Sequence, residues 1–350
     1  RQSGFPNVGV AAILWHGFRL AFGPARIYPK VLVLEMATDH PGDLAYLTSI
    51  APPHVSVLTA VSEEHTEFLG DLDGVAKEEG TVIRALHADG TAVLNGDDER
   101  VASMSETAQC RVITYGFGPD NAVRAERVEP EFALGTVFTR FTLSIDGKKY
   151  AVNLPNALGD GHVYAALAAA AVATALGLDA TLIPYGLGAY EPPPGRLRVL
   201  PGIKDTVIID DSYNASPRAG ELALKTVAGI PAPTTSRRLA VMGDMLELGA
   251  LTERAHQELG TMVAHFGFDE LIGVGPAASQ LCKVAVAGGL SEDHVFHFAT
   301  SAEAGRFLQD RICPGDLILV KGSRGMRMEK IVKELMAEPE RASELLVGQD

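Results

Sequence analysis

The chain has 350 residues, 47% of them hydrophobic, and a formal net charge of −14. At roughly 150 residues per domain this length predicts two domains, and the acidic balance argues against nucleic acid or an anionic membrane as the main partner. No apolar run reaches the about 18 residues needed to span a bilayer, and three widely spaced cysteines show no metal pattern, so we expect a reduced, cytoplasmic protein.

Short apolar runs alternate with helical stretches through the first third of the chain. The predicted strands are residues 31–34, 54–59, 91–94 and 111–115, and the predicted helices are 42–50, 71–87 and 97–105. This alternation indicates βαβ units and a parallel sheet. An alternating run at 137–145, a turn at Asp146-Gly147 and a returning run at 149–154 predict an antiparallel addition. Two helices follow, at about 161–177 and 181–188.

A proline cluster, Glu191-Pro-Pro-Pro-Gly195, is a stiff break and the best candidate for a domain boundary. After it we expect strands at 206–210, 238–242, 269–274, 294–297 and 316–321, and helices at 217–229, 251–266, 276–287, 301–311 and 326–337. The expected fold class is therefore α/β, with two doubly wound domains. Residues 1–190 would carry the mostly parallel sheet with its antiparallel addition, residues 191–338 a Rossmann-like sheet, and residues 339–350 a polar, frayed tail.

The central candidate stretch of the chain is Val207–Pro217. It opens with a β-branched apolar run, typical of a buried parallel strand, and turns polar at two consecutive aspartates. Ser216 followed by Pro217 predicts the start of a helix. Asp211 and Asn214 would then lie in the crevice beyond the carboxyl end of a strand, where open α/β sheets bind ligands. An ordinary polar loop between strand and helix is an equally good interpretation of the geometry alone.

Other polar side chains also follow predicted strands. Glu35 ends one run and His65 lies in the loop after the next; such a pair can share a divalent metal, although a histidine near a helix start is more often a cap. Asn95 is either a ribose or adenine contact or part of a capped turn. Arg196, at the predicted domain junction, suits either phosphate recognition or an inter-domain salt bridge.

Lys321, at the end of the last predicted strand, and Ser323 and Arg324, just after it, lie on the same predicted sheet edge as Asp211. Lys321 and Arg324 provide the positive charge that an anionic substrate needs, although each of the three residues alone could be ordinary loop chemistry. The sequence contains no Gly-x-x-x-x-Gly-Lys-Ser/Thr phosphate-binding loop (P-loop). It also contains no Gly-x-Gly-x-x-Gly, which argues against a dinucleotide oxidoreductase.

Several of these motifs together resemble the Mur ligase family, and within it the MurF branch. In the second half they are Pro194-Gly-Arg196, Val207–Pro217, Met242-Gly-Asp-Met-Leu-Glu-Leu-Gly249 and Lys321-Gly-Ser-Arg-Gly-Met326. In the first half the segments similar to the family's central domain are Val33-Leu-Glu-Met36, Pro41-Gly-Asp-Leu44, Ala51-Pro-Pro53, His65-Thr-Glu67 and Leu94-Asn-Gly-Asp-Asp98. The resemblance covers roughly residues 1–337.

The resemblance implies an ATP-dependent ligase of peptidoglycan precursor synthesis. In this family ATP phosphorylates a peptide carboxylate with the help of Mg²⁺, and an amine then displaces phosphate to form an amide. In the MurF branch the substrates are a UDP-MurNAc-peptide and D-Ala-D-Ala. The resemblance implies that Glu35 and His65 are magnesium ligands, and that Glu79, or else Lys77, stands at the position of a modified lysine whose carboxylate holds magnesium. It implies nucleotide contacts at Asn95, Arg196 and Asp211. The implied substrate contacts are Asn214, Lys321, Ser323 and Arg324.

The sequence also departs from the family pattern. The family's P-loop and UDP-sugar domain are not in this sequence, and Ala60 and Ala165 stand where the family usually has asparagine. We therefore expect the 350-residue chain alone to be catalytically inactive. The alternative hypothesis is a catalytically inactive, Mur-ligase-like binding or scaffold protein whose partners are other cell-wall synthesis proteins.

Overall fold

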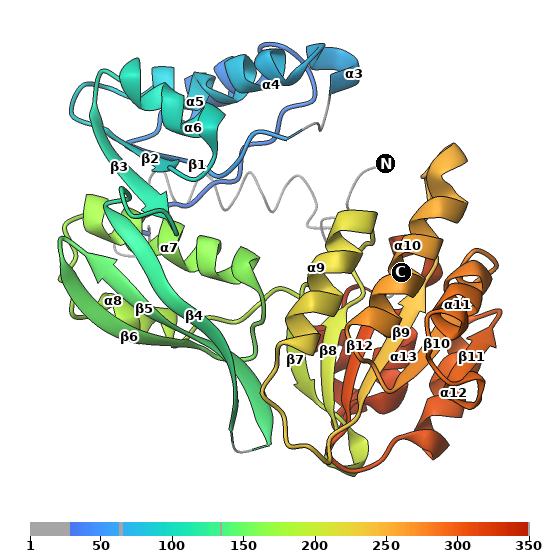
Figure 1. Cartoon of the computed structure of the whole chain (residues 1–350). Helices are drawn as coiled ribbons and strands as arrows, with labels where there is room; N and C mark the ends of the chain where they lie inside the picture. Colours follow the sequence, from blue (N-terminus) through green and yellow to red (C-terminus); the bar gives the residue numbers. More distant parts are fainter. Residues whose placement is uncertain (1–28, 63–65, 134, 349–350) are drawn as a thin grey trace, which may run out of the picture.

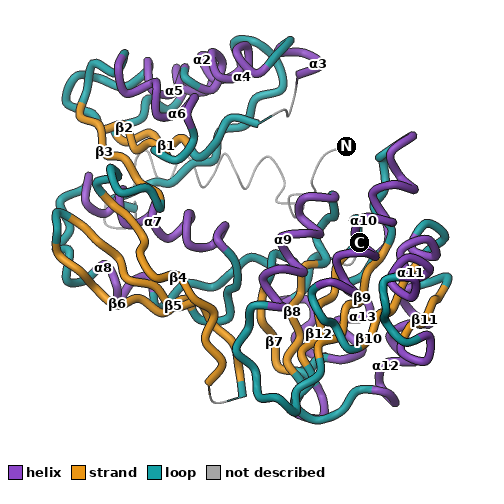
Figure 2. The backbone as a smooth tube through the Cα atoms, in the orientation of Figure 1, coloured by secondary structure: helices purple, strands orange, loops and turns teal. Residues whose placement is uncertain are grey.

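The computed structural model describes residues 29–62, 66–133 and 135–348 as two α/β domains (Figures 1 and 2). Each domain is built on a six-stranded sheet, with strand orders β1-β2-β3-β4-β5-β6 and β11-β10-β9-β12-β8-β7. The predicted fold class, two mostly parallel α/β domains, is confirmed. In the part of the chain that the structure describes, no helix combines the length and the apolar character that a membrane crossing requires.

The central sheet combines four parallel strands with an antiparallel hairpin. The parallel strands are β1 (Val55–Leu58), β2 (Thr91–Asn95), β3 (Arg111–Gly116) and β4 (Val123–Ala133). The predicted hairpin consists of β5 (Thr136–Ile145) and β6 (Lys148–Leu154). Strand β4, which the sequence pattern did not resolve, joins the two parts because it pairs parallel to β3 and antiparallel to β5.

Helices lie on both faces of the β1–β4 part of this sheet (Figure 1). The long helix α7 (Asp160–Ala175) packs against β1 to β4 with an apolar, alanine-rich surface. The predicted helix at 71–87 is interrupted at Gly80. The remaining helices are α2 (Asp43–Ile50), α3 (Thr66–Leu69), α4 (Leu72–Glu79), α5 (Thr81–Arg84), α6 (Glu99–Ser103) and α8 (Ile183–Leu187).

The apolar run at residues 31–34 is not a strand, so this prediction was wrong. Its four side chains are 50–86% exposed, and among the described residues β1 pairs only with β2. A strand satisfies its backbone N–H and C=O groups by pairing with a neighbour, and this run forms no such ladder with the described residues. Glu35, predicted at the end of this strand, therefore lies on an exposed segment without regular structure.

The C-terminal sheet has five parallel strands, covered on both faces, and one antiparallel edge strand. The strands are β7 (Arg198–Pro201, antiparallel), β8 (Val207–Asp211), β9 (Arg238–Gly243), β10 (Glu270–Val274), β11 (Val295–Phe298) and β12 (Leu317–Lys321). One face packs against α9 (Pro217–Ala228), α10 (Thr252–His265) and α11 (Ala278–Ala287). The other packs against α12 (Ser301–Arg311) and α13 (Glu329–Leu335). Each of these strands and helices except β7 was predicted from the sequence.

The segment after α13 is packed, which corrects the prediction of a frayed tail. Met336 forms a β-bridge with Gly202, next to β7, and the short helix α14 (Ala342–Leu345) follows. The side chains of Leu345 and Leu346 are 6% and 3% exposed and belong to the same core as α12 and α13. A few apolar residues spaced through a polar segment are enough to anchor it, because each buries its side chain in an existing core.

The two domains share main-chain hydrogen bonds and a core. The N–H of Leu158 donates to the C=O of Leu197 at 3.2 Å, and the N–H of Val199 donates to the C=O of Asn156 at 2.8 Å. The central-domain side chains of Val137 and Leu158 are fully buried in the core of the C-terminal domain. The junction is therefore a packed joint and not only a linker.

Candidate functional site

Two consecutive carboxylates end strand β8, and the inter-domain linker rests on them. Asp210 is fully buried and accepts hydrogen bonds from the backbone N–H groups of Gly195 and Ser212, each at 3.1 Å. Burial raises the pKa of Asp210 to about 6. Asp211 accepts a hydrogen bond from the N–H of Leu197 at 3.2 Å. The side chains at the end of β8 thus fix the path of the linker.

The linker approaches β8 so closely that only glycine fits at position 195. Gly195 has φ of 69°, and a Cβ there would lie 2.7 Å from the backbone nitrogen of Tyr213. The N–H of Tyr213 donates to the C=O of Gly195 at 3.1 Å. The exposed guanidinium of Arg196 then lies over the Tyr213 ring, 4.0 Å from its centroid, a cation–π contact. A positive charge is therefore held at the domain junction.

The predicted cluster of Asp211, Asn214 and Lys321 comes together at the carboxyl ends of β8 and β12. Lys321 pairs in register with Asp211, and its Nζ donates to Asp211 Oδ2 at 2.6 Å and to the C=O of Asn214 at 3.0 Å. The side chains of the ion pair are only 3% and 11% exposed. The side chain of Asn214 is exposed at the same edge. The parallel pairing of β8 with β12 brings together residues that were predicted to share a sheet edge.

The loop after β9 is tied to the same edge through Asp244 and Ser323. The carboxylate of Asp244 accepts from the N–H groups of Ala277 and Ala278, next to the start of α11. Its C=O accepts from the N–H of Ser323, whose hydroxyl accepts from the N–H of Leu246 at 2.9 Å. Ser323, predicted as a substrate contact, is 4% exposed and holds two loops together.

Arg324 contacts the chain's own C-terminal backbone. Its Nη2 donates to the C=O of Gly348, and its Nη1 lies 3.7 Å from Glu329 Oε2. Glu329 is fully buried and also accepts from Arg327 Nε at 2.5 Å. The Arg324 side chain is 41% exposed. The predicted substrate cation is therefore reachable from solvent, but one of its donors is already used.

In the central domain, Asn95 connects neighbouring loops. It ends β2, is 8% exposed, and donates from Nδ2 to the C=O of Thr59 at 2.7 Å. Its Oδ1 accepts from the N–H of Asp97 at 3.1 Å. Asp97 in turn accepts from the hydroxyl of Tyr164 on α7 at 2.9 Å. Asn95 thus links the ends of β1 and β2, and its contact with a nucleotide stays a prediction.

The structure leaves the predicted magnesium pair untested, because His65 lies outside the described residues. Glu35 is exposed, and Glu79 is half-buried on α4. Its neighbour Glu78 is buried and accepts from two backbone N–H groups around the start of α2, both at 3.0 Å. Within the ranges that the structure describes, no three His, Cys, Asp or Glu side chains form a metal-binding group. The described carboxylates therefore do not fit a magnesium site by themselves.

A histidine at the junction was missed by the sequence analysis. His162, on α7, lies with Nε2 2.6 Å from the C=O of Arg196 and with Nδ1 2.8 Å from the hydroxyl of Tyr190. Burial lowers the pKa of His162, which favours the neutral ring. Nε2–H then donates to Arg196 and Nδ1 accepts from Tyr190. A histidine near the start of an alanine-rich helix gave no signal of this long-range contact.

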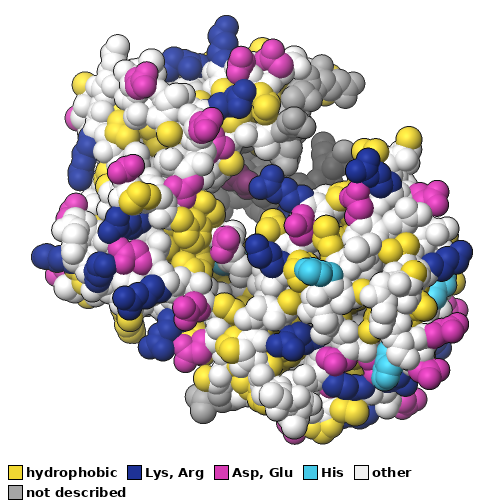
Figure 3. Space-filling model, in the orientation of Figure 1, with side chains coloured by type: hydrophobic (Ala, Val, Ile, Leu, Met, Phe, Trp, Pro, Cys, Tyr) yellow, Lys and Arg dark blue, Asp and Glu magenta, His cyan; other side chains and the backbone are white. Residues whose placement is uncertain are grey.

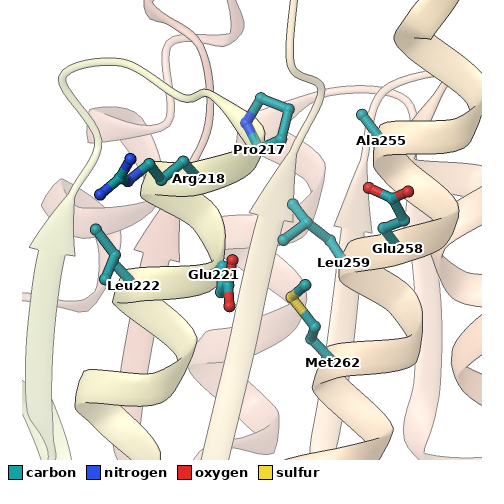
Figure 4. A pocket seen from close by; sticks show the side chains of 8 residues that line it. All are labelled: Pro217, Arg218, Glu221, Leu222, Ala255, Glu258, Leu259 and Met262. Atoms are coloured by element: carbon teal, nitrogen blue, oxygen red, sulfur yellow. The ribbon is translucent and has the colours of Figure 1, made fainter.

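The surface is hollowed where the upper part of the central domain faces the C-terminal domain, and basic side chains gather on the C-terminal-domain side of this hollow (Figure 3). A separate shallow groove lies between α9 and α10 (Figure 4). None of the candidate site residues lines that groove. Its lining consists of Pro217, Arg218, Glu221, Leu222, Ala255, Glu258, Leu259 and Met262.

Comparison with known families agrees with this architecture. The model of the Mur ligase middle domain matches residues 24–173, and that of the Mur ligase, glutamate ligase domain matches residues 195–324. The chain belongs to the Mur ligase family. In Mur ligase terms, the site described above lies where the linker meets the C-terminal domain.

Curated Mur ligase relatives match most of this chain. The UDP-N-acetylmuramoyl-tripeptide–D-alanyl-D-alanine ligase of Bacillus subtilis is 30% identical over 310 residues, which are 89% of this chain and 65% of the relative. The Escherichia coli enzyme of the same name is 30% identical over 305 residues, 87% of this chain and 64% of the relative. The chain thus spans less than two thirds of the length of these relatives.

Solved MurF structures share the fold. The MurF ligase of Thermotoga maritima, solved in complex with ADP, superposes with a TM-score of 0.70 at 25% identity, covering 90% of this chain and 69% of that one. A MurF of Acinetobacter baumannii gives a TM-score of 0.72 at 28% identity, covering 84% and 62%. Both domains of this chain therefore have the arrangement of a Mur ligase.

Proposed function

We propose that this chain supplies the central and C-terminal domains of a cytoplasmic, ATP-dependent ligase that joins D-Ala-D-Ala to a UDP-MurNAc-peptide in peptidoglycan precursor synthesis. One observation carries the proposal: the buried Asp211–Lys321 ion pair at the carboxyl ends of β8 and β12, 2.6 Å long. It lies beside Arg196, which the junction holds over Tyr213. The proposed reaction is the one for which the curated relatives are named.

The chemistry of the junction residues suits a nucleotide. Arg196 offers an exposed guanidinium whose fork matches two phosphate oxygens. Asp211 accepts from Lys321 and from a backbone N–H, and a carboxylate has about four lone-pair sites, so it can also accept ribose hydroxyls. The charge of Lys321 is balanced by Asp211, so Lys321 orients this carboxylate and the Asn214 carbonyl.

The substrate side of the site would use exposed groups at the same edge. The amide of Asn214 and the guanidinium of Arg324 are reachable from solvent and would contact the peptide substrates. ATP, when bound, supplies the phosphoryl group that activates the peptide carboxylate.

Binding tests this proposal directly. By titration calorimetry, we expect the chain to bind ADP or D-Ala-D-Ala, and Arg196→Ala to weaken ADP binding about tenfold by removing a charge-assisted contact. Arg218→Ala, which removes an exposed arginine from the α9–α10 groove, is the matched control. Absence of binding of both ligands by the unmodified chain would contradict a ligase role.

Turnover is a separate expectation. Because its sequence contains no P-loop pattern, the 350-residue chain alone should not hydrolyse ATP, even with magnesium, D-Ala-D-Ala and the UDP-MurNAc-tripeptide present. Release of phosphate measures this, and magnesium-dependent turnover by the purified chain would show the expectation to be wrong.

A non-catalytic scaffold is the second candidate function. The feature in its favour is that Ala60 and Ala165 stand where the resemblance to the family implies asparagines that help to hold metal or nucleotide. A scaffold would bind another cell-wall synthesis protein while binding neither ligand. Binding of ADP or D-Ala-D-Ala in the calorimetric test therefore separates the two functions.

A further inference from the structure

The last described residues of the chain return to the candidate site. After the bridge between Met336 and Gly202, the chain lies next to the end of β7 that is farther from the site, because Pro201 pairs with Val207 at the start of β8. The described chain then runs through α14, and Val347 reaches Gly195 at the opposite end of the same strands. The C-terminal segment therefore crosses from one end of the sheet to the other.

Close contacts hold this end of the chain in place. Val347 is 9% exposed, and its Cγ2 lies so near Gly195 that a Cβ there would be 2.6 Å away. The C=O of the next residue, Gly348, accepts a hydrogen bond from Arg324. Upstream, Leu345 and Leu346 anchor the segment in the domain core. Val347 and Gly348 thus cover the surface between the linker and Arg324.

Residues 347–348, called the tail below, bind Arg324 through a neutral carbonyl, that of Gly348. A guanidinium binds a carboxylate or phosphate more strongly than a carbonyl, and it can bind two of their oxygens at once. A second guanidinium, that of Arg196, lies one residue from Gly195 and over the ring of Tyr213. An anion that reached this surface would therefore gain stronger contacts than the tail makes.

We propose that residues 347–348 are an internal occupant of an anion-binding surface formed by Arg324 and Arg196, and that an anionic ligand must displace them. This inference rests on the proposed function, which supplies two sources of the same chemistry: a nucleotide phosphate and the carboxylate of D-Ala-D-Ala. The tail acts as an autoinhibitory contact, since binding requires Val347 to leave Gly195 and Gly348 to leave Arg324.

Two pairs of variants test this displacement in the full chain. Deletion of residues 347–350 removes the occupant, and deletion of 349–350 alone is its control for the shortened end. Val347→Gly loosens the contact without shortening the chain, and Ser343→Gly, which introduces glycine at an exposed position of α14, is its control. Hydrogen exchange of residues 342–348 and the affinities for ADP and for D-Ala-D-Ala are measured for each protein.

We expect the tail amides to be protected without ligand and to exchange faster when ligand is bound. Deletion of 347–350 and Val347→Gly should raise the affinity several-fold, up to about tenfold, for ADP if phosphate is the anion and for D-Ala-D-Ala if carboxylate is. Ligand binding with unchanged affinity in both variants would overturn the inference alone, as would unprotected tail amides. If no protein binds either ligand, the proposed function is contradicted and this inference falls with it.

Discussion

Buried carboxylates lie at both ends of the C-terminal sheet, but the two ends differ in how many cations are paired with them. At the amino ends of the strands, Asp316 is bound by the Nε and Nη2 of Arg237 at 3.0 and 2.5 Å. Glu270 is bound by Arg237 at 2.6 Å and by Arg311 at 2.8 Å. Both carboxylates are at most 1% exposed, and two guanidinium groups balance their two negative charges. This end is a closed, neutral network.

At the carboxyl ends, the same kind of burial is left without full compensation. Asp210 and Asp211 are 0% and 8% exposed, and among their contacts in the described structure a single cation, Lys321, forms an ion pair with Asp211. Asp210 accepts hydrogen bonds from backbone N–H groups, and burial raises its pKa to about 6. One end of the sheet is arranged for stability, and the other retains electrostatic strain where a ligand would bind.

The largest effect is expected from opening the closed network. Arg237→Met leaves Asp316 without a cation in a buried position, which should lower the free energy of unfolding by about 3–5 kcal/mol. Urea denaturation measures this loss. Arg254→Met, which removes an exposed ion pair with Glu258, should change it by about 0.5 kcal/mol or less. Similar small changes in both variants would show that the network contributes little.

Variants of the Asp211–Lys321 pair, at the carboxyl ends of the strands, should affect stability and ligand binding separately. Lys321→Met leaves Asp211 buried without its cation and should cost about 3 kcal/mol of stability. Adding Asp211→Asn should recover much of the lost stability, because it removes the uncompensated charge. Ligand affinity should stay low in the double variant if the pair belongs to the binding site. Recovery of affinity together with stability would assign the pair to folding alone.

The smallest effect concerns the pH dependence of Asp210. Its pKa is raised from 3.8 to about 6, so between these pH values the folded protein holds a proton that the unfolded chain has lost. Stability contributed by this group is present at low pH and decreases as pH rises through this window. Between these pH values the free energy of unfolding of the unmodified chain should fall by about 2–3 kcal/mol because of this group, and Asp210→Asn should abolish that fall. Parallel stability–pH curves for the variant and the unmodified chain would contradict this, and exposed Asp89→Asn is the control.

The sequence predicted those features that depend on local pattern. The strands β8 and β12 were recognised from their apolar runs, and their parallel pairing explains why Asp211 and Lys321 meet. The apolar run at 31–34 was misjudged because a strand depends on a pairing partner as well as on its own composition. Periodicity alone does not show which backbone groups a side chain will reach.

Side-chain partners from distant parts of the chain were the hardest to predict. Ser323 was correctly placed at the sheet edge, but its hydroxyl is used by the N–H of Leu246. Likewise, the role of His162 depends on the C=O of Arg196, which is 34 residues away in the sequence. Such contacts follow from how loops meet in space, and no local signal in the sequence reports them.

The packed joint between the domains limits how the chain can be divided. The linker prolines suggest a natural point for separating the domains, but Val137 and Leu158 complete the core on the far side of that point. A C-terminal fragment beginning after the prolines would lose these two side chains and the backbone partners of Leu197 and Val199. The two halves are therefore expected to unfold as one cooperative unit, and neither should be fully autonomous when expressed alone.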